Sequence, residues 1–128
     1  MPSKKREFGD IGEKIASEYL LDRGYKIIER NYQKTWGEID LITKKLNIIV
    51  FCEVKTRDLK NVEHFLPEYS IDARKIKKLK NMCEIYLTEK SYPASQQWQI
   101  DVISIAIDKN SKKAKIKHIE NAIWEKIY

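Results

Sequence analysis

Charged side chains alternate with apolar ones in two segments of the sequence, and this alternation is the first feature that could support chemistry. One segment carries Glu38 and Asp40 and the other carries Glu53 and Lys55, each pair separated by a single apolar residue. Side chains two residues apart on a β-strand lie on the same face, so each segment would present a charged face. Carboxylates on neighbouring strands repel one another unless a cation or a basic side chain neutralises them. Mg²⁺ prefers oxygen ligands and keeps several waters, so such an array suits hydrolysis of a phosphodiester bond.

The same alternation also fits acids on the solvent side of an antiparallel sheet that is buried on one face only. The spacing alone leaves both explanations open. A symmetric turn through residues 44–47 would place Glu38 opposite Glu53 and Asp40 opposite Phe51. Asp40 and Glu53 would then be diagonal neighbours on one face, within reach of a shared cation.

Seven segments have the periodicity of regular secondary structure. Apolar residues recur at three- and four-residue spacing over 10–22 and 70–89, which predicts two amphipathic helices. Gly24 can end the first helix and Ser70 can cap the second. Alternating β-branched and aromatic residues predict five strands, over 25–32, 37–42, 47–56, 98–105 and 114–119.

The order of these elements, αβββαββ, predicts the fold class. The connections between the first three strands are long enough for hairpins and too short for a parallel crossover, so these strands should form an antiparallel meander. Residues 58–69, around Pro67, are expected to form a loop. A helix before the meander and another after it predict an α/β fold, with a mixed sheet of about five strands flanked by helices.

Composition restricts the classes of protein to which the chain can belong. Its 128 residues suit one domain over 1–128, with 1–7 as a flexible basic arm. The longest apolar run, 48–52, is far shorter than the roughly 20 residues of a membrane-spanning helix. No apolar signal-peptide core follows the first residues, so a cytoplasmic protein without membrane contact is expected. Cys52 and Cys83 stand among apolar neighbours, where free cysteine behaves as a small hydrophobe.

The chain is basic, with a formal net charge of +6 and an isoelectric point of about 9.2. A basic excess of this size favours polyanionic partners such as nucleic acid, through phosphate contacts and counterion release. A solvated lysine-rich surface explains the same charge equally well. Both explanations also apply to the polar side of the second predicted helix, which carries Arg74, Lys75, Lys77, Lys78 and Lys80.

Two short motifs resemble those of a known nuclease superfamily. They are Gly-Glu-Ile-Asp-Leu-Ile at 37–42 and Val-Phe-Cys-Glu-Val-Lys-Thr-Arg at 50–57. Together they resemble the PD-(D/E)xK nucleases, and in particular the YraN-like family of small bacterial proteins, which is similar to the archaeal Holliday junction resolvases. The similarity covers nearly the whole chain and includes residues 12–16, 19–20, 24–25, 30–31, 79, 86–87, 100–102 and 118–122.

The resemblance implies a restriction-endonuclease-like fold and a role for each residue of the site. Asp40 and Glu53 would bind the metal directly, with the backbone carbonyl of Val54 as a further ligand. Lys55 would orient or polarise the attacking water, and Glu13 would complete the site from the first helix. The cofactor implied is Mg²⁺ or Mn²⁺.

Other residues near the motifs are candidates for the substrate side of this site. Glu38 either binds a second cation or pairs with a nearby lysine or arginine. Trp36 precedes the first motif and could stack on a base. Two histidines, His64 and His118, are more typical of surface or packing positions and are left out of the catalytic set. The candidate nucleic-acid contacts are Trp36, Arg57, Arg74, Lys75 and Lys78.

The resemblance predicts a metal-dependent endonuclease that acts on DNA. Branched or otherwise structured DNA is the expected substrate, and a two-fold dimer would match the paired cleavage sites of a junction. The alternatives are a module that keeps the nuclease fold and binds nucleic acid or protein without turnover, and a purely structural partner protein. The chain departs from the family at 62–70, which replaces a glycine-proline loop, and at Ile100, which replaces phenylalanine.

Overall fold

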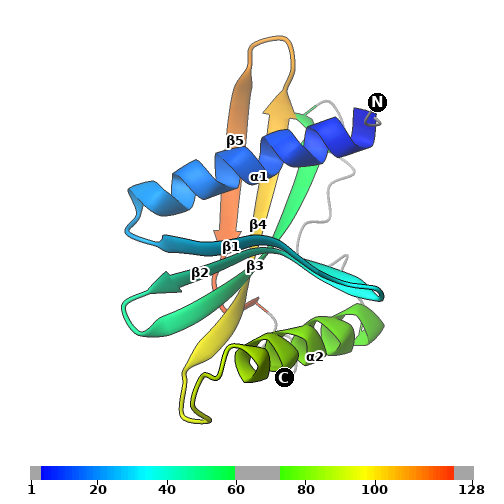
Figure 1. Cartoon of the computed structure of the whole chain (residues 1–128). Coiled ribbons are helices and arrows are strands. Elements are labelled where there is room, and N and C mark those ends of the chain that lie inside the picture. The colour runs from blue at the N-terminus through cyan, green and yellow to red at the C-terminus, as the bar shows by residue number, and fades with distance from the viewer. Residues whose placement is uncertain (1–3, 60–72, 123–128) are drawn as a thin grey trace.

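The computed structural model describes residues 4–59 and 73–122, with side chains from residue 7 onward. It contains two helices and five strands in the predicted order αβββαββ (Figure 1). The predicted α/β class with a mixed five-stranded sheet is confirmed. The elements are α1 (Lys4–Asp22), β1 (Lys26–Lys34), β2 (Gly37–Lys45), β3 (Ile48–Asp58), α2 (Ala73–Glu89), β4 (Trp98–Asp108) and β5 (Lys113–Ile119).

Helix α1 extends beyond its predicted start. It begins at Lys4, so residues 4–7 of the expected basic arm are helical. Phe8 packs against the core beneath the helix, which gives this early turn an apolar contact of its own. Several sequence-based predictions concern residues outside the described ranges: residues 1–3 of the arm, most of the loop with His64 and Pro67, and the Ser70 cap.

The sheet has the strand order β1-β2-β3-β4-β5. The first three strands pair antiparallel, as predicted, and β4 and β5 also pair antiparallel, whereas β3 and β4 are parallel. A parallel pair needs a crossover connection, and α2 lies in the crossover between β3 and β4. Within residues 4–59 and 73–122, no helix is long and apolar enough to cross a lipid bilayer.

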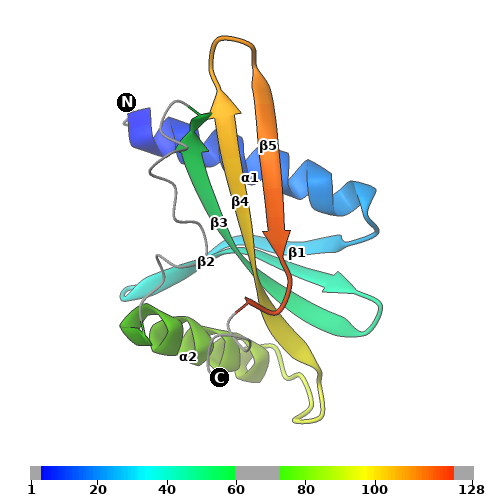
Figure 2. The same cartoon turned by 180° about the vertical axis from the view of Figure 1, so that it is seen from behind.

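One helix covers each face of the sheet (Figures 1 and 2). The core beneath α1 includes Leu20, Leu41 and Val50, and the core beneath α2 includes Phe51 and Tyr86. Consecutive residues of β3 therefore point into opposite cores, as the two-residue period of a strand requires. A sheet covered on both faces explains why its central strands are apolar on both sides.

The turn between β2 and β3 is shorter than the symmetric turn predicted from the sequence. Lys45 pairs with Ile48, which leaves a turn of only two residues. The first of them, Leu46, has a φ of 56°, the left-handed conformation that such tight turns require. The prediction that Asp40 pairs with Phe51 is therefore wrong, because Phe51 pairs two residues further along β2. An even shift keeps every side chain on its predicted face.

A kink in β1 interrupts the regular alternation next to Asp40. Asn31 has a φ of 52°, a left-handed conformation that asparagine tolerates better than most residues. Its neighbours Arg30 and Tyr32 pair with Leu41 and Ile39, so Asn31 lies across from Asp40. The sequence predicted that Ile39 and Leu41 would share a face. They lie instead in different cores, Ile39 beneath α2 and Leu41 beneath α1. From Ile39 to Leu41 the side chains of β2 thus change from the α2 face of the sheet to the α1 face, at Asp40, the residue predicted to bind a metal.

Helix α1 approaches β3 very closely at Gly12. A Cβ atom at this position would lie 1.9 Å from Thr56 Oγ1 and 2.9 Å from Thr56 Cβ. Only a residue without a side chain permits this approach without a displacement. The residue that follows is Glu13, so the contact sets the position of Glu13 relative to the end of β3.

Gly12→Ala is expected to lower the free energy of unfolding by roughly 1–3 kcal/mol, because the added methyl group would push α1 away from β3. Gly9→Ala in the same helix is the matched control, since a Cβ there would meet nothing within 4 Å. Alanine should stabilise that position by roughly 0.5–1 kcal/mol. Urea denaturation of both variants measures the difference. A Gly12→Ala protein as stable as the wild type would show that α1 is not held against β3 at this residue.

Candidate active site

The predicted metal ligands lie where β2 and β3 separate. Backbone pairing between these strands ends at Leu41 and Cys52, and Asp40 and Glu53 are the next residue on each strand. Beyond this point the Val54 amide donates a hydrogen bond of 2.7 Å to Asp40 Oδ2, so a side chain takes the place of a backbone partner. The two carboxylates therefore face each other at the mouth of the gap between the strands.

The Val54 carbonyl also projects toward this gap. In an extended strand the N–H and C=O of one residue point to the same neighbouring strand. The Val54 N–H points to Asp40 on β2, so the carbonyl points to the same side, past the end of the β2–β3 pairing. The position suits the role of backbone ligand that the resemblance implies for Val54.

A cavity of about 580 Å³ surrounds the two carboxylates. It brings together Glu13 from α1, Glu38 and Asp40 from β2, and Glu53, Lys55 and Arg57 from β3. All four side chains predicted to be catalytic thus line one hollow, although they come from three elements. Their roles in catalysis stay predictions.

Four polar residues that were not among the predicted site residues also line this cavity: Asp10, Asn31, Gln33 and Thr56. Gln33 donates a hydrogen bond of 3.1 Å to Glu38 Oε2, so an amide of β1 contacts this acid. Asn31 and Gln33 are two residues apart on β1. Their two-residue spacing, which parallels that of the acids on β2, was the available signal in the sequence.

Burial and the negative charge of the site raise the pKa of Asp40 and of Glu13. Burial raises the pKa of Asp40 to about 8, helped by the charge of Glu53 and opposed by the hydrogen bond from the Val54 amide. Burial also raises the pKa of Glu13, with a further contribution from Glu38. The predicted effect of clustering like charges is therefore present at both residues.

A basic side chain from α2 balances part of this charge. Lys75 Nζ lies 3.1 Å from Glu53 Oε1, and the Glu53 side chain is only 13% exposed. Arg30 lowers the pKa of Glu13 through its charge, against the larger effect of burial. Asp40, deeper in the site, keeps a raised pKa in spite of these cations.

The donor atoms around Asp40 fit a hard divalent cation. Two carboxylates and a backbone carbonyl are the oxygen ligands that Mg²⁺ accepts together with waters. No three acidic side chains of this cavity, all of them within the described ranges, bring their oxygens within 4.8 Å of one another. A cation here would therefore be held by Asp40, Glu53 and the Val54 carbonyl, with waters filling its other positions, and Glu13 would act at longer range.

Cation affinity is expected to rise with pH, because Asp40 must lose its proton before it binds a metal. With a pKa of about 8, the affinity should increase up to tenfold per pH unit below pH 8 and level off above it. Isothermal titration with MnCl₂ at pH 6, 7, 8 and 9 measures this dependence. An affinity that is constant from pH 6 to 8 would mean that Asp40 is not a ligand or is already ionised.

The remaining nucleic-acid candidates gather around an adjoining hollow. Trp36, Arg74, Lys75 and Lys78 line a cavity of about 410 Å³ between β2 and α2. This cavity shares Lys75 with the first one, and it also shares the acids Glu38, Asp40 and Glu53. The candidates predicted from the motif and those predicted from the basic helix thus meet at one place.

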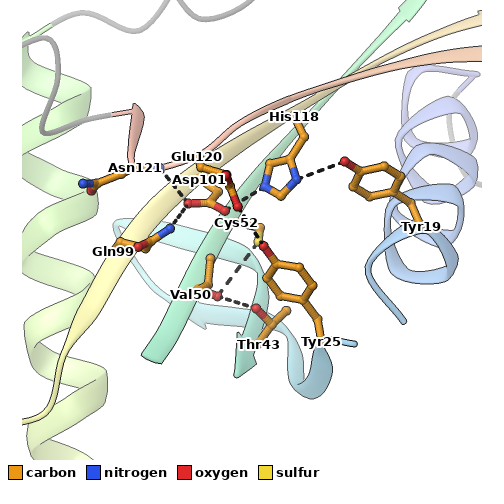
Figure 3. A network of polar contacts seen from close by, with 10 residues as sticks. All are labelled: Tyr19, Tyr25, Thr43, Val50, Cys52, Gln99, Asp101, His118, Glu120 and Asn121. Carbon is orange, nitrogen blue, oxygen red and sulfur yellow. Dashed lines mark hydrogen bonds and ion pairs between the residues drawn. The ribbon is translucent and has the colours of Figure 1, made fainter. Parts of the chain in front are cut away.

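His118, which sequence reasoning left as a surface or packing residue, belongs to a polar network between α1 and the strands β4 and β5 (Figure 3). Its Nε2 lies 2.7 Å from Asp101 Oδ2, and its Nδ1 lies 3.1 Å from the Tyr19 hydroxyl. Asp101 is fully buried and also accepts hydrogen bonds from the Gln99 side chain and the Asn121 amide. The network joins α1, β4, β5 and the segment after β5.

Asp101, His118 and Glu120 have ligand atoms within 4.8 Å of one another, close enough to hold a metal ion. Protein groups already engage all three side chains, however. Tyr25 donates a hydrogen bond of 3.3 Å to Glu120, and Asp101 accepts hydrogen bonds at both of its oxygens. Burial and the charges of Asp101 and Glu120 raise the pKa of Tyr25, which keeps its hydroxyl a donor. We therefore assign this network a structural role.

Comparison with known proteins places the chain in a family. The sequence model of the uncharacterised protein family UPF0102 matches residues 12–105. A UPF0102 protein of Syntrophomonas wolfei is 42% identical over 119 residues, which cover 91% of this chain and 97% of the relative. A UPF0102 protein of Thermodesulfovibrio yellowstonii is 43% identical over 120 residues, which cover 92% and 96%. The predicted YraN-like membership is thereby confirmed, and the chain belongs to the protein family UPF0102.

Proposed function

We propose that this protein is a metal-dependent endonuclease that hydrolyses phosphodiester bonds in DNA. One observation carries the proposal: Asp40, Glu53 and the Val54 backbone converge where β2 and β3 separate, in a cavity that Lys55 also lines. A buried carboxylate with a raised pKa beside a second carboxylate is costly for a protein that binds no cation. Perturbed acids in a cleft are typical of functional sites.

Each residue of the cavity has a defined part in this proposal. Asp40, Glu53 and the Val54 carbonyl would hold Mg²⁺ or Mn²⁺, which when bound polarises a phosphate oxygen and lowers the pKa of a coordinated water. The Lys55 ammonium group would donate a hydrogen bond to the attacking water and hold it in line with the phosphorus. Glu13 would add negative charge from the α1 side of the cavity.

The substrate side of the proposal rests on charge and on the family. The net charge of +6 and the basic residues of α2 beside the cavity favour a polyanion. Branched DNA is the finer proposal, and the resemblance to junction resolvases supports it. A two-fold dimer would match the paired cleavage sites of a junction.

Lys55→Ala is expected to slow metal-dependent cleavage by roughly 10²–10⁴-fold, the usual effect of removing a group that acts on the attacking water. Lys26→Ala is the matched control, because Lys26 is exposed at the far end of the β1–β2 ribbon from Asp40. Cleavage of labelled linear, single-stranded and four-way-junction DNA is measured with MgCl₂ and with MnCl₂. A wild-type protein that cleaves none of them with either metal would refute the proposal.

A module that binds nucleic acid without turnover is the second candidate. The ion pair between Lys75 and Glu53 favours it, because a protein cation already neutralises one of the proposed ligands. This candidate predicts DNA binding that weakens steeply with salt, survives in Asp40→Asn and Lys55→Ala, and is not accompanied by cleavage.

A further inference from the structure

The hollow of about 410 Å³ beside the proposed metal site is built differently from the site itself. Its floor is apolar, formed by the buried side chains of Leu79 and Met82 on α2. Trp36 stands at its rim, with 40% of its surface exposed, on the turn between β1 and β2. Figures 1 and 2 both show the tip of this β1–β2 ribbon beside α2.

Glycine at position 37 brings the turn close to the helix. A Cβ atom on Gly37 would lie 2.9 Å from Met82 Sδ and 3.5 Å from Lys78 Cδ. The close approach places the neighbouring Trp36 in the wall of a hollow that the apolar side chains of Leu79 and Met82 also line. With 40% of its surface exposed, Trp36 is accessible to a ligand in this hollow.

The two hollows adjoin at the carboxylates. Glu38, Asp40 and Glu53 line both, so the apolar hollow lies beside the point where a scissile phosphate would lie. Arg74 and Lys78, from successive turns of α2, add positive charge to its wall. An apolar, aromatic hollow with basic side chains next to a phosphate position has the chemistry of a nucleotide.

We propose that this hollow takes one unpaired nucleobase, stacked on Trp36, of the nucleotide next to the scissile phosphate. The inference rests on the proposed function, because the phosphate position is that of the proposed metal site. In an intact duplex each base is paired and stacked, so it would have to leave the helix to enter the hollow. The substrate class is therefore DNA with an unpaired nucleotide at the cleavage position: a single strand, a flap, a loop or a junction whose bases are unpaired at the branch point.

The test is equilibrium binding in EDTA, where metal-dependent cleavage does not occur. Two labelled DNAs carry the same sequence, one single-stranded and one fully paired. The wild type is expected to bind the single strand more tightly. Trp36→Ala should weaken single-strand binding about tenfold, as the loss of one base-stacking contact predicts, and change duplex binding less than twofold.

Two variants control for a general disturbance of the protein. Leu46→Ala removes an apolar side chain that is 85% exposed at the other end of β2, and it should leave both affinities unchanged. Trp36→Phe keeps an aromatic face and should recover most of the single-strand affinity. A flap DNA can also carry the fluorescent base 2-aminopurine at its unpaired position. Stacking on Trp36 should quench this fluorescence when the DNA binds the wild type, and no quenching should follow binding to Trp36→Ala.

Equal affinity of the wild type for both DNAs, or an equal loss for both DNAs in Trp36→Ala, would overturn the inference. The outcome is separable from that of the proposed function, since the binding assay contains no divalent cation. A protein that prefers the single strand through Trp36 but cleaves no DNA with Mg²⁺ or Mn²⁺ would keep the base-binding hollow and refute the nuclease. Cleavage of intact duplex and single strand at equal rates would keep the nuclease and refute the hollow.

Discussion

Asp40→Asn is expected to stabilise the metal-free protein at pH 7 and to abolish its response to metal. The pKa of Asp40 is about 8 in the folded protein, against an ordinary value of 3.8 for an aspartate side chain. Between these values the folded state holds a proton that the unfolded state lacks, so stability falls as pH rises from about 4 to 8. Asparagine does not titrate and can still accept the hydrogen bond from the Val54 amide.

The size of the effect follows from the pKa difference. At pH 7 the wild type should be less stable than Asp40→Asn by up to about 4 kcal/mol, or roughly 15 °C in the unfolding midpoint. At pH 4 the two proteins should be about equally stable. A metal ion that binds only the folded wild type, at a concentration one hundred times its Kd, would raise the free energy of unfolding by about 2.7 kcal/mol. The variant would gain no stability from the metal.

Thermal unfolding at pH 4 and 7, with and without millimolar MgCl₂ or MnCl₂, measures both effects. Asp22→Asn is the matched control, because Asp22 is exposed at the end of α1 and lines neither cavity. It should follow the wild type under every condition. A wild type that no divalent cation stabilises would contradict the metal site, and an Asp40→Asn protein less stable than the wild type at pH 7 without metal would contradict the electrostatic argument.

Asp101→Ala is expected to lower the free energy of unfolding by roughly 3–5 kcal/mol, a large part of the stability of a domain of this size. The Asp101 side chain is fully buried and accepts hydrogen bonds from Gln99, His118 and the Asn121 amide. Truncation would leave these donors without an acceptor, and each buried donor left unsatisfied is costly. Chemical denaturation measures the loss.

Asp101→Asn separates the hydrogen bonds from simple removal of volume. The asparagine oxygen can keep the bonds from Gln99 and Asn121, while its amide can donate to His118 if the imidazole changes tautomer. The loss should then be only about 1 kcal/mol. Asp101→Asn and Asp101→Ala proteins of equal stability would show that the network does not depend on its acceptor atoms.

The element order and the identity of the site residues are properties that the local sequence determines. The helical spacing of apolar residues in 10–22 and their alternation in 37–42 decide which side chains must face a core. A helix in place of the strand, or a strand in place of the helix, would expose apolar surface. The same alternation in the two motifs placed Asp40 and Glu53 on two consecutive strands. The sequence therefore predicted αβββαββ and the set of side chains that meets in one cavity.

The relative position of those side chains was decided by contacts between distant residues. A two-residue turn at Leu46 set the β2–β3 register, and a left-handed Asn31 on the neighbouring strand kinked the ribbon opposite Asp40. Neither follows from periodicity: an even shift of register leaves every residue on the same face, and the kink depends on the backbone conformation of one residue. The partners of His118 could not be predicted for a related reason: Tyr19 and Asp101 are far away from it in sequence.

The sequence by itself thus determined the elements, the faces of most of their side chains and the acidic and basic groups of the site, but not the change of face between Ile39 and Leu41. Only the tertiary structure decided that β2 and β3 separate at Asp40, that Lys75 lies against Glu53 and that an apolar hollow under Trp36 adjoins them. The physical reason is that hydrophobic periodicity is encoded within each element. Strand separation, ion pairs and cavities depend on how α1 and α2 pack on opposite faces of the sheet, which no single segment encodes.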